Sequence, residues 1–84
     1  MIYKVFTVYD SAVEAYLQPF CAQTKGHAIR MFTDSVNDSN HQFNKYPDDY
    51  VLFELGSYSD ETANFELYAS PVSVGVAIEF KRPV

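Results

Sequence analysis

Tryptophan is absent from this sequence of 84 residues, and cysteine, glycine and basic residues are scarce. The single Cys21 excludes an internal disulfide and a zinc site built on several cysteines. Six Lys and Arg residues stand against eleven Asp and Glu residues, so the formal net charge is −5. Because nucleic acids and anionic lipids are themselves negative, this balance disfavours non-specific attraction to either.

Long apolar runs are also missing, so the sequence predicts no membrane-spanning segment and no contact with a membrane. The N-terminal stretch MIYKVFTVYD has no basic region followed by an apolar core and a small-residue cleavage site. We therefore expect no secretory signal there. Together with the lone thiol, which fits a reducing compartment, these features predict a cytosolic protein.

Apolar residues make up 48% of the chain, and seven Phe and seven Tyr residues supply all its aromatic rings. This composition is typical of a folded protein rather than a disordered one, and the length predicts one domain over residues 1–84. A chain this short buries a modest fraction of its surface, and tyrosine is frequent at interfaces. We therefore expect a homo-oligomer, most simply a dimer.

Several stretches are predicted to be strands because they are rich in β-branched and aromatic residues. Ile2–Tyr9 carries bulky side chains on both faces, as expected for a central strand or for one covered by a partner. Leu17–Gln23 is extended, but Pro19 removes a ladder donor and places this segment at a strand start or a sheet edge. Tyr50–Tyr58 is a further strand, and Phe65–Tyr68 is expected to pair with it as a hairpin.

One helix is predicted between residues 24 and 37, with Thr24 as a suitable N-cap. Its apolar face has the three-to-four spacing of a helix and consists of Ala28, Ile29, Phe32 and Val36. The residues from Asn37 to Asp49 are polar and rich in turn formers, so they predict a long connection.

The C-terminal stretch PVSVGVAIEF alternates between apolar residues and small or polar ones, and a period of two predicts a strand. Gly75 and the terminal position also allow an irregular docked segment. Residues 71–84 are therefore expected to form either a C-terminal strand or a docked arm.

Together these elements predict an α+β fold, in which a four- to five-stranded antiparallel sheet carries one helix on one face, as a two-layer sandwich. A single helix covers only one face of such a sheet. The remaining apolar and tyrosine surface therefore favours self-association.

Two groups of residues suit catalysis but have simpler explanations. Cys21 and His27 could act as a nucleophile and its base, but Cys21 lies in an apolar strand and no glycine-rich elbow accompanies the pair. Asp34, Asp38 and His41 have a spacing that suits metal ligands, but they are fewer than four and match a solvated helix end. We therefore predict no catalytic residues, no metal and no cofactor, and a protein that is not an enzyme.

The basic residues and tyrosines suit a different site, one for single-stranded nucleic acid, because cations contact phosphate and tyrosine rings stack on bases. Lys25 and Arg30 share the N-terminal half of the predicted helix, where backbone amides also attract phosphate. Tyr16, Tyr46 and Tyr58 are further rings available for stacking. Scattered solubilising charges and interface tyrosines explain the same residues without a ligand. The candidate nucleic-acid-binding residues are Lys4, Lys25, Arg30, Lys81, Arg82, Tyr3 and Tyr9.

Six short strings occur in a characteristic order and spacing: VYDS (residues 8–11), QPF (18–20), AIRMF (28–32), DSVN (34–37), PDDY (47–50) and LFELG (52–56). In this order they resemble the small nonstructural protein of gokushoviruses, bacteriophages of the Microviridae with single-stranded circular DNA. The resemblance extends from the N-terminus to about Tyr68, and more loosely through ASPVSVGVAIEF.

The resemblance implies a non-enzymatic phage protein of the host bacterial cytoplasm that binds single-stranded DNA. It further implies a role in viral DNA replication or in its coupling to packaging. The net charge of −5 then predicts a confined basic patch, or a dimer that doubles the cations into one groove. The alternative is a protein–protein interaction module without nucleic-acid affinity, which binds itself, a viral protein or a host protein.

Overall fold

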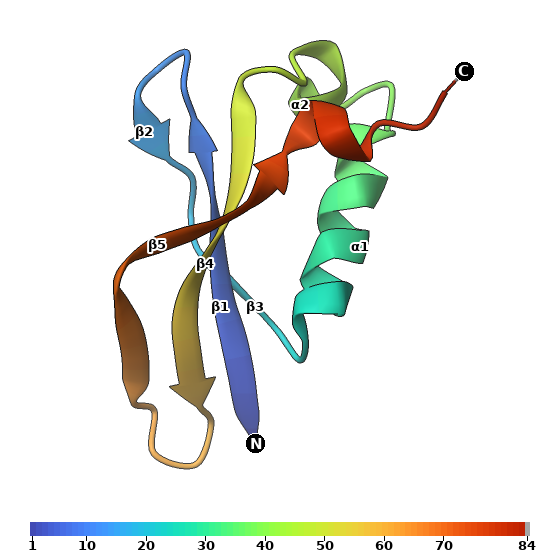
Figure 1. Ribbon diagram of the computed structural model, residues 1–84. Coiled ribbons are helices and arrows are strands. Elements are labelled where there is room, and N and C mark those ends of the chain that lie inside the picture. Colours follow the sequence, from blue (N-terminus) through green and yellow to red (C-terminus); the bar gives the residue numbers. More distant parts are fainter. Residues whose placement is uncertain (84) are drawn as a thin grey trace.

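The computed structural model describes residues 1–83 and shows an α+β fold with one five-stranded antiparallel sheet (Figure 1). The predicted fold class is therefore confirmed. Helix α1 crosses one face of the sheet, accompanied by two short helical pieces. In chain order the elements are β1 (Ile2–Asp10), β2 (Ala15–Tyr16), β3 (Phe20–Ala22), α1 (Lys25–Val36), α2 (Gln42–Lys45), β4 (Tyr50–Ser59), β5 (Phe65–Val76) and the 3₁₀ turn η1 (Ala77–Phe80).

Strand β1 is central, as its bulky residues on both faces predict. It pairs with β4 along its whole length on one side, and with both short strands β2 and β3 on the other. Strand β5 pairs with β4 and forms the far edge of the sheet. The segment that contains Pro19 lies between β2 and β3 at the opposite edge, where a missing ladder donor costs little.

Helix α1 begins and ends close to the predicted positions. The Thr24 side chain accepts a hydrogen bond from the backbone N–H of His27 at 3.1 Å, which satisfies one free donor of the first turn. The buried residues of α1 are Ala28, Phe32 and Val36, which follow a four-residue spacing. They pack against a group of strand side chains that includes Phe6, Val8 and Leu52.

The connection from residue 37 to residue 49 contains a helical turn that the sequence pattern does not predict. This turn, α2, buries Phe43 against Phe32 and Tyr50, with ring centroids 5.3 and 4.5 Å apart. A turn of four residues with one buried side chain has no measurable periodicity, because a helical pattern needs several turns to show.

Strand β5 is much longer than the predicted Phe65–Tyr68, and it is bent in the middle (Figure 1). Leu67 stands opposite Gly56, but Val72 stands opposite Glu54, so β5 has extra residues between these two positions. Pro71 lies in this unpaired bend. The bend separates a lower half, which pairs with the end of β4, from an upper half that leads to the helical layer.

The C-terminal segment is part strand and part docked turn. The alternating pattern holds through Val76, but residues 77–80 form η1, and the Phe80 ring packs edge-on against Phe32 at 5.6 Å. Of the two alternatives expected for this segment, the strand therefore holds to Val76 and the docked segment holds for residues 77–80, because packing of Ala77 and Phe80 in the core outweighs the local period. Val84, the last residue of the predicted arm, lies outside the described residues.

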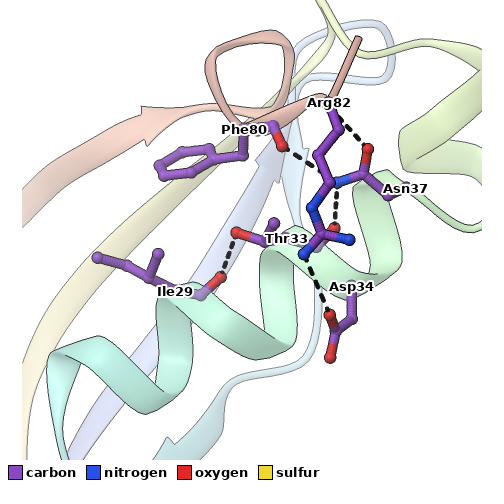
Figure 2. A network of polar contacts seen from close by, with 6 residues as sticks. All are labelled: Ile29, Thr33, Asp34, Asn37, Phe80 and Arg82. Carbon is purple, nitrogen blue, oxygen red and sulfur yellow. Dashed lines mark hydrogen bonds and ion pairs between the residues drawn. The ribbon is translucent and has the colours of Figure 1, made fainter. Parts of the chain in front are cut away.

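Asn37 ties this C-terminal segment to the end of α1 (Figure 2). Its Nδ2 donates to the carbonyl oxygens of Thr33 and Phe80 at 2.8 and 3.1 Å, and its Oδ1 accepts from the backbone N–H of Arg82 at 2.8 Å. The Arg82 guanidinium also lies 4.0 Å from Asp34. These contacts place Arg82 against the helical layer.

Candidate functional site

Figure 1 shows α1, α2 and η1 on the same side of the sheet, so no helix of residues 1–83 covers the other side. Side chains alternate between the faces of a strand, and paired residues share a face. Because Phe6, Val8 and Leu52 pack under the helix, the intervening residues of β1 and their partners point away from it. We call this side the uncovered face because no helix lies on it, although Val5 and Thr7 at its centre are buried. The register assigns to it Tyr3, Val5, Thr7, Tyr9, Tyr16, Cys21, Val51, Phe53, Gly56, Tyr58, Phe65, Leu67, Ser73 and Val76.

Aromatic rings form two groups on the uncovered face. At one end, the Tyr16 ring lies 4.8 Å from Tyr9 and 5.8 Å from Phe53. At the other end, Tyr58 lies 4.7 Å from Phe65. Tyr16 and Phe65 remain 51% and 57% exposed. The rings therefore present flat apolar surface to solvent, held in place by their neighbours.

A shallow hollow of about 230 Å³ lies between β2 and the bend of β5. On one wall of the hollow, the hydroxyl of the buried Thr7 donates a hydrogen bond to the carbonyl oxygen of Leu17 at 2.8 Å. The hollow adjoins the Tyr16 group and is lined by Thr7, Tyr16, Leu17, Pro19, Leu55 and Pro71. It offers room for one flat group beside the rings.

Charged side chains of the strands all point to the helical side. Lys4 and Glu54 share the face of Phe6, Asp10 stands opposite the core residue Tyr50, and Glu66 stands opposite Ser57, the partner of Lys4. Among residues 1–83, no Lys, Arg, Asp or Glu of a strand therefore lies on the uncovered face. An uncharged aromatic surface of this kind suits stacking or apolar contact.

Lys4, a predicted phosphate contact, is engaged by an acid. Its Nζ lies 3.6 Å from Oε2 of Glu54, a carboxylate that is 8% exposed and also accepts a hydrogen bond from the Tyr68 hydroxyl. That hydrogen bond, together with partial burial and the charge of Glu54, raises the pKa of Tyr68 above its ordinary value. Glu54 thus neutralises Lys4 locally.

The other predicted cations belong to the helical layer and its two ends. Lys81 donates to the carbonyl oxygen of Asn44 at 3.3 Å, and Arg82 pairs with Asp34. Lys25 and Arg30 are exposed on α1. Within residues 1–83 neither forms an ion pair with an acid.

The structure therefore separates the predicted site residues into two sets. Tyr3 and Tyr9 lie on the uncovered face, whereas all five cations lie in or beside the helical layer. The two sets approach each other at the start of α1, where a hollow of about 400 Å³ is lined by Tyr3, Tyr58 and residues 21–23 and 27. Lys25 stands between these segments in the chain.

Phe53 and Phe65 are not among the site residues predicted from the sequence, although they complete the two aromatic groups. Alternation along 50–58 places Val51 and Phe53 on one side of a strand, but does not say which side meets the helix. For Phe65 the partner Tyr58 decides the matter, and that pairing depends on the register of the hairpin. The sequence therefore indicated that Val51 and Phe53 share one face of their strand, but not that this face is exposed.

Cys21 and His27 line the same hollow at the start of α1. Cys21 is exposed, and within the described part of the chain no hydrogen bond joins its thiol to the His27 ring. The His41 side chain caps α2: its Nδ1 accepts a hydrogen bond from the backbone N–H of Phe43 at 3.1 Å. Among residues 1–83 no three His, Cys, Asp or Glu side chains form a group able to hold a metal ion.

No helix in residues 1–83 has the length and apolar character needed to cross a membrane.

Comparison with known proteins gives one match. No curated protein and no solved structure matches this sequence. A protein-family model described as Phage ORF5 protein does match, and it covers residues 3–80. The match includes every strand, α1, α2 and η1, apart from the first residue of β1. The chain therefore belongs to the Phage ORF5 protein family.

Proposed function

We propose that this phage protein is a non-enzymatic protein of the gokushovirus nonstructural type, and that it binds single-stranded DNA on the uncovered face. It would act in viral DNA replication, or in its coupling to packaging, in the cytoplasm of the bacterial host. The observation that supports this proposal is the pair of aromatic groups around Tyr16 and Tyr58, exposed on a sheet face without charged strand residues.

Stacking supplies the affinity in this proposal. Every base has a π face, and each base stacked on an aromatic side chain contributes about 1–3 kcal/mol without regard to sequence. A duplex hides its base faces, whereas a single strand exposes them. The face therefore favours single-stranded over double-stranded DNA. The hollow beside Tyr16 would take one base edge-on or in a stack.

Phosphate contacts are few in this proposal, because most cations are engaged or distant. Lys25 and Arg30 are exposed and free of acidic partners in the described chain, and Lys25 lies in the chain between Gln23 and His27, which line the hollow at the Tyr3 end of the face. With one or two such contacts, the slope of log affinity against log salt is expected to be about −0.7 to −1.4. A general DNA-coating protein would have a much steeper slope.

A protein partner is the second candidate, and the uncharged character of the face favours it specifically. The centre of a protein interface is depleted in charged residues and enriched in aromatic ones, which also describes the surface around Tyr9, Tyr16 and Phe53. The two candidates differ in one observable, since only the first requires affinity for a free oligonucleotide.

The test is fluorescence anisotropy of a labelled single-stranded oligonucleotide titrated with the purified protein, at low and at near-physiological salt. We expect saturable binding with the shallow salt slope given above. Tyr16→Ala should weaken binding by roughly 5- to 150-fold, which corresponds to one lost stacking contact. Tyr46→Ala is the matched control, because Tyr46 is 54% exposed, close to the 51% of Tyr16, but caps the end of α2 in the helical layer.

Equal effects of Tyr16→Ala and Tyr46→Ala would remove the uncovered face as the DNA site. No binding at low salt by the folded protein would overturn the DNA proposal and leave the protein-interaction candidate. A labelled duplex of the same length completes the experiment, because stacking predicts that it binds more weakly than the single strand.

A further inference from the structure

The lower half of β5 is an open sheet edge. All residues from Phe65 to Ser73 are exposed, and the apolar side chains among them include Leu67, which is 63% exposed. β4 pairs with one side of this strand, and no element of residues 1–83 pairs with the other. Its outward backbone groups are therefore free to pair with another strand.

The position of Gly56 shows which backbone groups point outward. A Cβ atom on Gly56 would strike the carbonyl oxygen of Glu66, so this carbonyl points toward β4. The N–H of the next residue, Leu67, lies on the opposite side of the same planar peptide and points away from β4. In an antiparallel ladder the N–H and C=O of one residue point the same way, so both groups of Leu67 lie at the open edge.

This edge lacks most of the features that block edge pairing. Natural edge strands are commonly protected by lysine, proline, a strong bend or a covering element. Between Phe65 and Ser70 the only charged residue is Glu66, whose side chain lies on the helical side. Pro71 and the bend limit the free edge at its far end. A straight segment of five or six residues, about the length of an ordinary strand, therefore remains available.

We propose that a second copy of this chain pairs with the lower half of β5, antiparallel and centred on Leu67, to make a two-fold symmetric dimer with one continuous sheet. Leu67 then stands opposite Leu67 of the second copy, and the two residues exchange both N–H···O bonds. Phe65 stands opposite Ala69 of the second copy, and Glu66 opposite its Tyr68. No like charges face each other in this register.

The apolar area suits an interface of modest size. If an aromatic side chain buries about 200 Å², then exposed fractions of 57% for Phe65 and 44% for Tyr68 leave about 200 Å² on these two residues. Leu67, Val72 and the exposed small residues between them extend the patch. The total stays at or below the roughly 800 Å² per partner of a standard interface. We therefore expect a dimer that dissociates on dilution.

The dimer axis runs perpendicular to the sheet, because only this axis relates two antiparallel edge strands while keeping both in one sheet. The two uncovered faces then lie on the same side and meet at Leu67 and Phe65. Tyr58 and Phe65 of both copies would form one aromatic surface across the axis. This inference concerns the free protein and does not depend on DNA binding.

The experiment is a charge exchange at the symmetry axis, followed by sedimentation equilibrium without DNA. Wild-type protein should shift from 9.6 kDa toward twice that mass as its concentration rises from about 10 μM to about 1 mM, the range of a weak interface. Leu67→Lys and Leu67→Glu should each remain monomeric, because like charges would stand directly opposite. An equimolar mixture of the two variants should recover the dimer.

Leu17→Lys is the control, since Leu17 is also exposed but lies by the opposite edge of the sheet. It should dimerise as the wild type does. Circular dichroism of each variant verifies the fold. A wild type that stays at 9.6 kDa throughout this range, or a dimer that survives Leu67→Lys, would overturn the proposal. So would a mixture of the two charged variants that remains monomeric.

Discussion

The Nζ of Lys4 lies 3.6 Å from Oε2 of Glu54, on the helical side of the sheet. The aromatic rings around Tyr58 lie on the other side. Glu54 is nearly buried and also accepts a hydrogen bond from the Tyr68 hydroxyl, so its carboxylate has one hydrogen-bond donor and one cation beside it. A cation fixed in this way is a poor contact for phosphate, whereas Lys25 and Arg30 keep their charge free for solvent and ligands.

The pairing of Lys4 predicts unequal roles for the cations. Lys4→Ala should change the affinity for single-stranded DNA by less than about twofold, since the net charge near Glu54 is small with the pair intact. The double variant Lys25→Ala, Arg30→Ala should lose its remaining salt dependence, because each phosphate contact contributes about 0.7 to the slope. Anisotropy titrations at several salt concentrations measure both. A larger loss from Lys4→Ala than from the double variant would contradict this assignment.

Gly56→Ala is expected to destabilise the fold by about 3 kcal/mol or more, because the site combines an unusual backbone conformation with close strand contact. Gly56 has φ +152°, and an added Cβ would lie 2.8 Å from the Leu67 Cα. Urea denaturation measures the change. Gly26→Ala is the contrasting variant: its Cβ would meet nothing closer than 3.8 Å, so a gain of roughly 0.5–1 kcal/mol is expected in the helix. Similar behaviour of the two variants would argue against the described β4–β5 packing.

Asn37→Ala should release the C-terminal segment from α1. The amide makes three hydrogen bonds, two as donor and one as acceptor, to Thr33, Phe80 and Arg82. Their loss is expected to cost about 1–3 kcal/mol, given roughly 1 kcal/mol for each net hydrogen bond. Faster amide exchange should appear at Lys81 and Arg82, whereas exchange in β1 should follow only the global change in stability. Asn40→Ala, in the exposed loop after α1, should leave exchange at these residues unaltered.

Two tyrosines predict how stability depends on alkaline pH. The pKa of Tyr50 is raised above 10.0 by burial and then by the nearby charges of Asp10 and Asp49, and that of Tyr68 is raised chiefly by its hydrogen bond to Glu54. A raised pKa means that the folded state holds the proton more tightly than the unfolded state does. This contribution is complete below pH 10.0 and is lost as the pH rises through the folded pKa values.

The measurement is the free energy of unfolding as a function of pH, together with the absorbance of tyrosinate in the folded protein. Tyr68→Phe should reduce the decline in stability above pH 10.0, because one of the two linked groups is removed. It also leaves Glu54 with Lys4 as its remaining partner. An alkaline decline identical in wild type and Tyr68→Phe would show that the Tyr68–Glu54 hydrogen bond does not form in solution.

Local sequence patterns were sufficient for the strongly periodic elements. Strand β1 and the main part of β4 follow from their β-branched and aromatic content, and α1 follows from the spacing of Ala28, Phe32 and Val36 behind the Thr24 cap. The short turn α2 was not predictable in this way, because one buried residue, Phe43, defines it. For the turn η1 the sequence left a strand and a docked segment as alternatives, because its alternating residues match a strand until the packing of Phe80 on Phe32 is known.

The residues of the candidate site were likewise only partly predictable from the sequence. Tyr3 and Tyr9 could be selected from composition, since tyrosine is a common stacking residue. Phe53 and Phe65 join them only through pairing across strands that are distant in the sequence. The separation of the cations from the rings was also beyond local patterns, because Lys4 and Arg82 find their acidic partners through long-range contacts.

The amino-acid sequence by itself determined the element types, the apolar face of α1 and the surplus of aromatic residues, because these depend on spacing within one segment. Only the tertiary structure decided which sheet face stays uncovered, where β5 bends and which residue of its edge points outward. These features depend on strand register and on the side of the sheet that the helix crosses. Both are set by contacts between segments far apart in the chain, where a shift of one residue would move every side chain of a strand to the other face.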